Sequence, residues 1–300
     1  MLTEAAPSEG PVLNVASMTG VGSPSVLRIL LGAQLRRLRE SKGITLEEAG
    51  NAIRASHSKI SRLEGGRVGF KDRDVVDLFM YYDVTDPAQI QTLREIAARA
   101  NSRGWWSDYS DILPSWFEEY ISLEQAAIEI RGYEVQFVPG LLQTEEYARA
   151  VTLLAYSNPK EISRRVSLRM ARQAMLSGAQ PVRLGMMLDE ATLSRPIGGT
   201  SVMRAQLRHL IEMSQRPNVT IQILPFKAGG HAAAGGPFSV LHFAESDLSD
   251  IVYLEQLATA QYLEKPDMVS KYLAVMERLR LEAATPADSI DRLQSMLSDI

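Results

Sequence analysis

Residues 31–67 read LGAQLRRLRESKGITLEEAGNAIRASHSKISRLEGGR, and this stretch decides the fold of the first part of the chain. Leu31, Leu35 and Leu38 recur at helical spacing and predict a single apolar stripe on a first helix. Gly43 predicts the end of that helix, because glycine is the usual residue just beyond a helix terminus. We therefore expect a helix that buries one face and turns its basic side chains elsewhere.

Two further helices are predicted within the same stretch. Thr45 followed three residues later by Glu48 is a capping box and starts the second helix, and Ser56 can cap a third. Ile60 and Leu63 are the inward positions of the third helix, so its outward face is polar. Two short helices joined by a tight turn, with the second presenting a polar surface, are typical of a helix-turn-helix whose second helix enters the DNA major groove amino end first.

The third helix also carries a family resemblance. The run SHSKISRLE at residues 56–64, followed by GGR, resembles the hallmark of the XRE (Cro/C1-type) helix-turn-helix regulators, and the resemblance covers roughly residues 30–84. It implies base contacts from His57, Ser58, Lys59 and Arg62, and phosphate contacts from the start of the second helix. With adjoining polar and basic side chains included, the candidate DNA-contacting residues are Thr45, Arg54, Ser56, His57, Ser58, Lys59, Ser61, Arg62 and Arg67.

Two positions depart from the family pattern. Leu46 stands where a glutamine usually opens the second helix, which removes one polar backbone contact. Arg54 replaces the glycine common in the turn, and a non-glycine residue at positive φ costs about 1 kcal/mol. We expect either a strained turn or a different one.

The distribution of charge supports DNA binding independently of the resemblance. The whole chain has a net charge of −4, but residues 28–71 hold ten basic and four acidic residues, a net charge of +6. A basic module inside an acidic protein is suited to binding phosphates by counterion release. The alternative, a small helical bundle with solvated basic faces, is the weaker interpretation.

The length of 300 residues favours two domains. We expect a flexible arm at 1–27, an all-α helix-turn-helix domain of about five helices at 28–103, and an α+β domain at 104–300 for dimerisation and for binding an effector or partner. In the third segment, helices are predicted at 116–131, 144–157, 159–177, 203–215, 266–282 and 287–297. Strands are predicted at 182–188, 219–224, 238–243 and 250–254.

The third segment resembles the large C-terminal domain of an actinobacterial regulator family whose function is unknown. The motifs are WW at 105–106, LPSWF at 113–117, YEVQFVPGLLQT at 133–144 and LDEA at 188–191. Two later motifs, QILPF at 222–226 and VYLE at 252–255, also resemble this domain. Members of this family are often termed antitoxin-like, which implies a small partner protein, and the resemblance carries no catalytic residue.

Two features of the third segment admit more than one interpretation. The aromatic residues that follow Gly104 fit an effector pocket or interdomain packing, with packing favoured. The candidate effector or interdomain residues are Trp105, Trp106, Tyr109, Trp116 and Phe117. The glycine-rich loop 229–236 could approach an anion, but it lacks the P-loop lysine and spacing, so a flexible hairpin connection is favoured.

Several classes of function are excluded or weakened. The chain has no cysteine, and its four histidines lack metal-helix spacing, so we expect no metal, no cofactor and no catalytic residue. The adjacent pairs Asp189-Glu190 and Glu118-Glu119 point apart and are better explained as capping or surface groups. Neither a secretory signal nor a membrane span is predicted, so a cytoplasmic protein is expected.

The sequence thus predicts a DNA-binding transcriptional regulator, acting as a homodimer on an inverted repeat in double-stranded DNA. Its C-terminal domain would receive a small-molecule effector or a protein partner. The main alternative is an antitoxin-like interaction module that binds a small partner protein and autoregulates its own operon. An enzyme fused to a DNA-binding module comes third.

Overall fold

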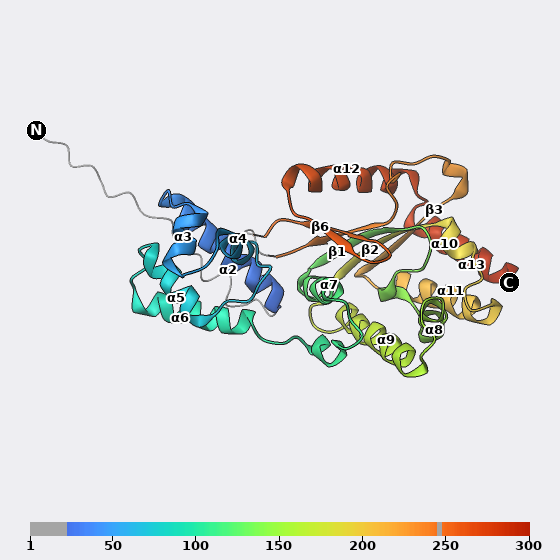
Figure 1. Cartoon of the computed structure of the whole chain (residues 1–300). Coiled ribbons are helices and arrows are strands. Elements are labelled where there is room, and N and C mark those ends of the chain that lie inside the picture. The colour runs from blue at the N-terminus through green and yellow to red at the C-terminus, as the bar shows by residue number, and fades with distance from the viewer. Residues whose placement is uncertain (1–22, 245–247) are drawn as a thin grey trace, which may run out of the picture. The chain divides into compact units, whose positions relative to one another are not determined.

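The computed structural model describes residues 23–244 and 248–300, which divide into two compact units, Met1–Trp105 and Trp106–Ile300 (Figure 1). This division falls two residues after the boundary predicted between 103 and 104. Residues 1–22 of the predicted arm lie outside the described residues. Each unit is considered by itself.

The first unit is entirely helical in its described part, and the five predicted helices are confirmed. The apolar stripe of the first helix is buried as expected, with Leu31, Leu35 and Leu38 at most 3% exposed. The helices are α2 (Pro24–Ser41), α3 (Leu46–Ala52), α4 (His57–Glu64), α5 (Asp72–Tyr81) and α6 (Pro87–Ala100).

The first helix begins earlier than the sequence suggested. Pro24 occupies its first turn. A proline is tolerated there because the backbone N–H that it lacks would have no hydrogen-bond partner within the helix. Val26 and Leu27 are 0% and 1% exposed. The last four residues of the predicted flexible arm therefore belong to a buried helix, and the local proline and serine content concealed its apolar face.

The second unit is built on one mixed sheet of six strands in the order β3-β2-β1-β4-β5-β6. Strand β2 pairs in parallel with both β1 and β3, whereas β4, β5 and β6 add antiparallel pairs on the other side of β1. The α+β class is confirmed. The strands are β1 (Glu129–Glu134), β2 (Arg183–Asp189), β3 (Val219–Leu224), β4 (Phe238–His242), β5 (Ile251–Glu255) and β6 (Ala260–Leu263).

Helices cover both faces of this sheet (Figure 1), α12 on one face and α7 and α9 on the other. Helices α9 and α13 each begin at a capping side chain followed by proline, with Asn158 before α9 and Thr285 before α13. The α-helices are α7 (Ser115–Ala126), α8 (Glu145–Leu153), α9 (Pro159–Arg172), α10 (Glu190–Ser194), α11 (Thr200–Ser214), α12 (Pro266–Glu282) and α13 (Pro286–Asp299). The 3-10 turns are η1 (Trp105–Tyr109), η2 (Gly140–Leu142), η3 (Gln173–Leu176) and η4 (Phe226–Ala228).

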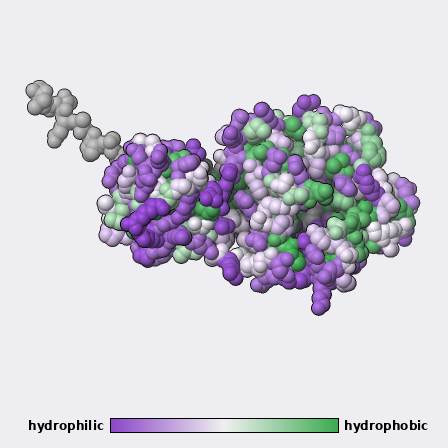
Figure 2. Space-filling model, viewed as in Figure 1, coloured by the Kyte–Doolittle hydropathy of each residue, from purple (hydrophilic) through white to green (hydrophobic). Residues whose placement is uncertain are grey.

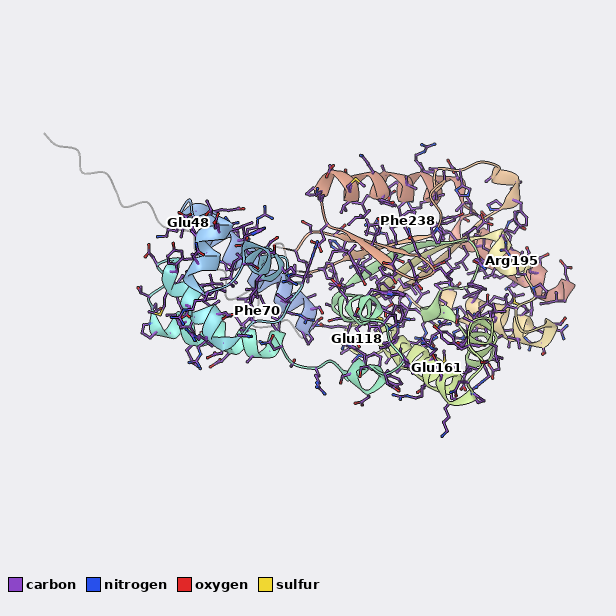
Figure 3. All side chains as sticks on the ribbon, viewed as in Figure 1. Glu48, Phe70, Glu118, Glu161, Arg195 and Phe238 are labelled. Carbon is purple, nitrogen blue, oxygen red and sulfur yellow. The ribbon has the colours of Figure 1, made fainter. Side chains whose placement is uncertain are left out.

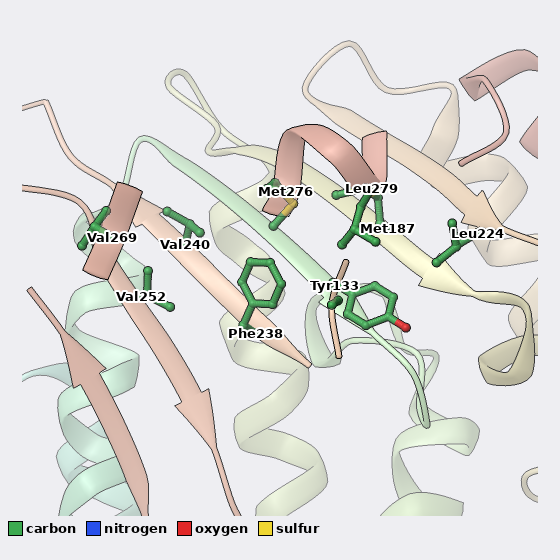
Figure 4. Packing of buried hydrophobic residues seen from close by; sticks show 10 residues of the cluster. Tyr133, Met187, Leu224, Phe238, Val240, Val252, Val269, Met276 and Leu279 are labelled. Atoms are coloured by element: carbon green, nitrogen blue, oxygen red, sulfur yellow. The ribbon is translucent and has the colours of Figure 1, made fainter. Parts of the chain in front are cut away.

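The core between α12 and the sheet is apolar (Figure 4). Val269, Met276 and Leu279 of α12 lie over strand residues that include Val240 and Val252. All five are at most 5% exposed. Burial of this kind stabilises the unit by roughly 25 cal/mol per Å² of apolar surface removed from water.

Three predictions for the second unit were wrong in part. The helix predicted at 116–131 ends at Ala126, and Glu129–Glu134 form β1, whose charged residues and glycine hid a central strand. Strand β6 was missed because Ala260–Leu263 is short. Loop 229–236 is not a hairpin connection, because β3 and β4 are separated in the sheet by β2 and β1.

Candidate nucleic-acid interface

Helices α3 and α4 begin at the caps that the sequence predicted. The Thr45 hydroxyl accepts a hydrogen bond from the Glu48 amide at 3.2 Å, and the Glu48 carboxylate accepts one from the Thr45 amide at 2.8 Å. Glu48 is labelled at the start of α3 in Figure 3. The Ser56 hydroxyl accepts from the Lys59 amide at 3.3 Å and so caps α4. Both short helices are therefore defined at their amino ends by side chains.

The turn between α3 and α4 is tight. Arg54 has φ 55°, so the position that favours glycine is occupied by a residue in the left-handed region. A Cβ on Gly50 would lie 2.6 Å from the carbonyl oxygen of Ala55, which explains why this helix position needs a glycine. The Ala55 amide donates to the Gly50 carbonyl at 2.8 Å and closes the turn.

Helix α4 is anchored by its apolar positions and turns its polar ones to solvent. Ile60 and Leu63 are each 1% exposed, as predicted. The visible face of the first unit is largely hydrophilic (Figure 2). The predicted DNA-contacting residues that are exposed are Thr45, Arg54, Ser56, His57, Ser58, Ser61, Arg62 and Arg67.

Lys59 differs from the other candidates. Its ammonium group forms an ion pair with the carboxylate of Asp74 on α5, and its side chain is 30% exposed. Asp74 itself is buried. The nearby His57 imidazole lies 3.3 Å from the Ser58 hydroxyl, and the Arg62 guanidinium donates to the Ser58 carbonyl at 3.3 Å. The outward polar side chains are thus partly ordered by one another, whereas Lys59 is held toward α5.

A buried ion pair that sequence reasoning missed ties α2 to the carboxyl end of α4. Arg39 donates two hydrogen bonds to the Glu64 carboxylate, at 2.6 Å from Nε and 2.9 Å from Nη2, and a third to the Ile44 carbonyl at 2.8 Å. The hydrogen bond to Glu64 raises the pKa of Arg39. Arg39 therefore contributes no free charge to the surface, although the sequence counted it among the outward basic residues. The net charge of the module is unchanged, because Glu64 was counted too.

This arrangement defines the first unit as a helix-turn-helix DNA-binding module, and a family model described as "Helix-turn-helix domain" matches residues 30–93. A second model, described as "Domain of unknown function (DUF5753)", matches residues 117–295. The chain belongs to the DUF5753 family. No curated protein and no solved structure matches this chain.

The candidate effector residues occupy different environments. Trp106 is buried in a small cluster with Leu113, Ile121 and Leu168, so it packs within the second unit. Trp105 is 37% exposed. The Trp106 ring thus forms part of a helix-packing core around α7 and α9.

The other three candidates lie along α7 or just before it. The Tyr109 hydroxyl is 3.1 Å from the Ser167 hydroxyl. The Trp116 carbonyl accepts a hydrogen bond from the Tyr262 hydroxyl of β6, and its ring makes an edge contact with Phe117 at 5.7 Å between centroids. Of the five candidate effector residues, Phe117 is the one that lines a large cavity in the described residues of the second unit.

The predicted capping role of Asp189 is confirmed, and this residue also joins a polar cluster. Its carboxylate accepts from the Ala191 amide at 2.9 Å at the start of α10, and from the Tyr133 hydroxyl at 3.2 Å. His231, from loop 229–236, lies 3.1 Å from the same hydroxyl. This cluster places the glycine-rich loop against the carboxyl ends of β1 and β2. No group of three metal-ligating side chains is found in the part of the chain that the structure describes.

Within residues 23–244 and 248–300, no helix is both long and apolar enough to cross a lipid bilayer.

Proposed function

We propose that this chain is a sequence-specific transcriptional regulator of the XRE type, in which α4 reads base edges in the major groove. The observation that carries the proposal is the outward face of α4, where exposed polar side chains surround a helix held by Ile60 and Leu63. The SHSKISRLE run and the net charge of +6 over residues 28–71 support it.

The test is selection of binding sites from random duplex DNA with the full chain. The proposal expects enrichment of one defined sequence, bound far more tightly than scrambled DNA at physiological salt. Binding to all duplexes with equal affinity would contradict sequence-specific regulation. Lys271→Ala, which removes an exposed lysine of α12, serves as the control and is expected to leave the enriched sequence unchanged.

We propose further that the protein acts as a homodimer on an inverted repeat. Helix α4 has eight residues and contacts too few base pairs to single out one genomic site. Twofold symmetry then requires half-sites about 34 Å, or one turn of DNA, apart, or a multiple of that distance. Light scattering on the full chain with a whole site and with a half-site tests this. A complex of one chain per whole site would exclude the dimer.

The second unit is proposed to control DNA binding by receiving a ligand or a protein partner, without carrying out a reaction. The basic module already holds the residues needed to contact DNA, and simple dimerisation needs less chain than Trp106–Ile300. An effector controls DNA affinity only if it binds the competent and incompetent forms with different affinity, and tenfold control needs about 1.4 kcal/mol of coupling. An antitoxin-like role is favoured instead if the chain forms a stable complex with the product of an adjacent small gene.

A further inference from the structure

A cavity of about 500 Å³ opens in the second unit between the sheet and helices α7 and α9. Its floor is formed by residues of β1, β2, β4 and β5, and one side is closed by residues 136–141. Pockets for small organic ligands commonly have volumes of 300–1,000 Å³. The cavity therefore has the size of a site for a small molecule.

One wall of the cavity is aromatic. The ring of Phe117 stacks on Tyr120 at 5.7 Å between centroids, and Tyr120 stacks on Tyr253 of β5 at 4.1 Å. Tyr120 and Tyr253 are both buried. A wall of this kind suits the apolar or aromatic part of a ligand.

Two arginines of α9 reach the cavity, and their charges are not equally balanced. Arg172 forms a buried bidentate pair with Glu124, with hydrogen bonds of 2.8 and 2.6 Å. Arg169 donates to the neutral Gln143 amide oxygen at 2.7 Å, and among the described residues no carboxylate forms an ion pair with it. Burial and the neighbouring Arg172 lower the pKa of Arg169 to about 10. The Arg169 guanidinium therefore has no carboxylate in direct contact, and the charge of Glu255 acts on it only at longer range.

Two carboxylates lie at the same end of the sheet. Glu134 ends β1 and Glu255 ends β5, and both strands run antiparallel to β4 between them. Glu255 accepts a hydrogen bond from the Tyr253 hydroxyl at 3.0 Å, and no partner of the Glu134 carboxylate is found in the described part of the chain. Burial and the charge of Glu255 raise the pKa of Glu134 to about 8. Among the described residues, no cation forms an ion pair with either carboxylate, although Arg169 and Arg172 interact electrostatically with Glu255 at longer range.

We propose that this cavity binds a small zwitterion of the amino acid or dipeptide class. Its ammonium group would lie between Glu134 and Glu255, its carboxylate would pair with Arg169, and its apolar body would lie on the aromatic wall. Arg169 and Glu134 are partly buried, so a ligand with a single charge would leave one of these two groups without a direct partner, at a cost in binding free energy. This inference deepens the proposed function. The regulatory role of the ligand rests on that function, whereas the binding site itself does not.

The test uses the full chain and three matched probes: the dipeptide phenylalanyl-leucine, its C-terminal amide and its N-acetyl derivative. Binding is measured by calorimetry without DNA. The dipeptide is expected to bind at least about tenfold more tightly than either derivative, a difference of about 1.4 kcal/mol. The proposal is overturned if the dipeptide does not bind at millimolar concentration, or if either derivative binds as tightly as the dipeptide.

Two variants separate the two ends of the cavity. Glu134→Gln should abolish the preference for the dipeptide over its N-acetyl derivative, and Arg169→Gln should abolish the preference over the amide. Lys160→Gln on α9 and Glu146→Gln on α8 remove exposed charges that do not line the cavity and should change neither preference. Circular dichroism confirms that each variant is folded. Unchanged preferences in both cavity variants would also overturn the proposal.

DNA binding is measured separately by fluorescence anisotropy with and without the dipeptide. Loss of DNA binding with intact dipeptide binding would reject the proposed function and leave the ligand site standing. Intact DNA binding without dipeptide binding would reject the ligand site and leave the proposed function standing.

Discussion

Arg39 on α2 and Glu64 at the end of α4 lie 25 residues apart in the sequence, and their buried ion pair fixes the end of α4 to the first helix of the module. The same guanidinium holds the Ile44 carbonyl just before α3. One arginine therefore connects α2 with the end of α4 and with the residue that precedes the cap of α3.

Removing one member of this pair should be costly, because the other is left as an uncompensated buried charge. Glu64→Gln is expected to lower the free energy of unfolding by about 3–5 kcal/mol, measured by urea denaturation. The exposed pair of Arg36 and Glu40 provides the control, and Arg36→Ala should cost less than about 1 kcal/mol. Similar costs for the two variants would show that the buried pair has no special role.

The turn at Arg54 combines backbone strain with a useful charge. Arg54→Gly should raise the free energy of unfolding by up to about 1 kcal/mol, because glycine adopts positive φ without strain. The same variant should bind DNA more weakly, since one exposed cation is removed. Arg54→Ala keeps the strain and removes the charge, so it should weaken DNA binding without the gain in stability. A decrease in the stability of Arg54→Gly would contradict this explanation of the turn.

The ion pair between Lys59 and Asp74 should limit the contribution of Lys59 to DNA binding. Asp74→Asn removes a carboxylate beside α4 and releases the ammonium group, so DNA affinity should rise and its salt dependence should steepen. Anisotropy titrations at several salt concentrations measure both effects. Asp77→Asn, on the same helix, is the control and should have a smaller effect. Weaker operator binding in Asp74→Asn would show that Asp74 holds Lys59 in its working position.

The carboxyl group of Glu134 should make stability depend on pH. Its pKa is raised to about 8 in the folded state, so between about pH 4.5 and 8 the folded chain holds a proton that the unfolded chain has released. This contribution to stability is present at low pH and is lost as the pH rises through 8. Glu255 and Tyr147 also interact electrostatically with this group, and both residues are retained in the variant.

Glu134→Gln removes that titration. The free energy of unfolding of Glu134→Gln minus that of the unmodified chain should be about 1–3 kcal/mol larger at pH 9 than at pH 5. Glu146→Gln, which changes an exposed carboxyl, should show no such gain. Parallel stability curves for Glu134→Gln and the unmodified chain over this range would mean that the group has an ordinary pKa.

The first unit could be predicted closely because its signals are local. Thr45, Glu48 and Ser56 cap helices within three residues of themselves, and Ile60 and Leu63 follow helical spacing. The pairing of Arg39 with Glu64 could not be predicted in this way, because it joins separate helices.

In the second unit, the alternating strand Val219–Leu224 was predicted with its observed bounds. Strand β1 was missed because its sequence, EIRGYE, has no such alternation and owes its place to pairing with β2 and β4. The cavity was also missed, because it too depends on contacts between segments that are distant in the sequence. Its charged residues come from four distant segments that only the fold brings together: Glu124, Glu134, Arg169, Arg172 and Glu255.

The most direct test of α4 as the recognition helix is the joint change of His57, Ser58, Lys59 and Arg62 to alanine. Anisotropy is measured on the selected operator and on scrambled DNA. The preference for the operator is expected to fall to near one, because each base-reading side chain that is removed costs about 1–3 kcal/mol of discrimination, while the fold is retained. Unchanged operator affinity in this variant would falsify the assignment of α4 as the recognition helix.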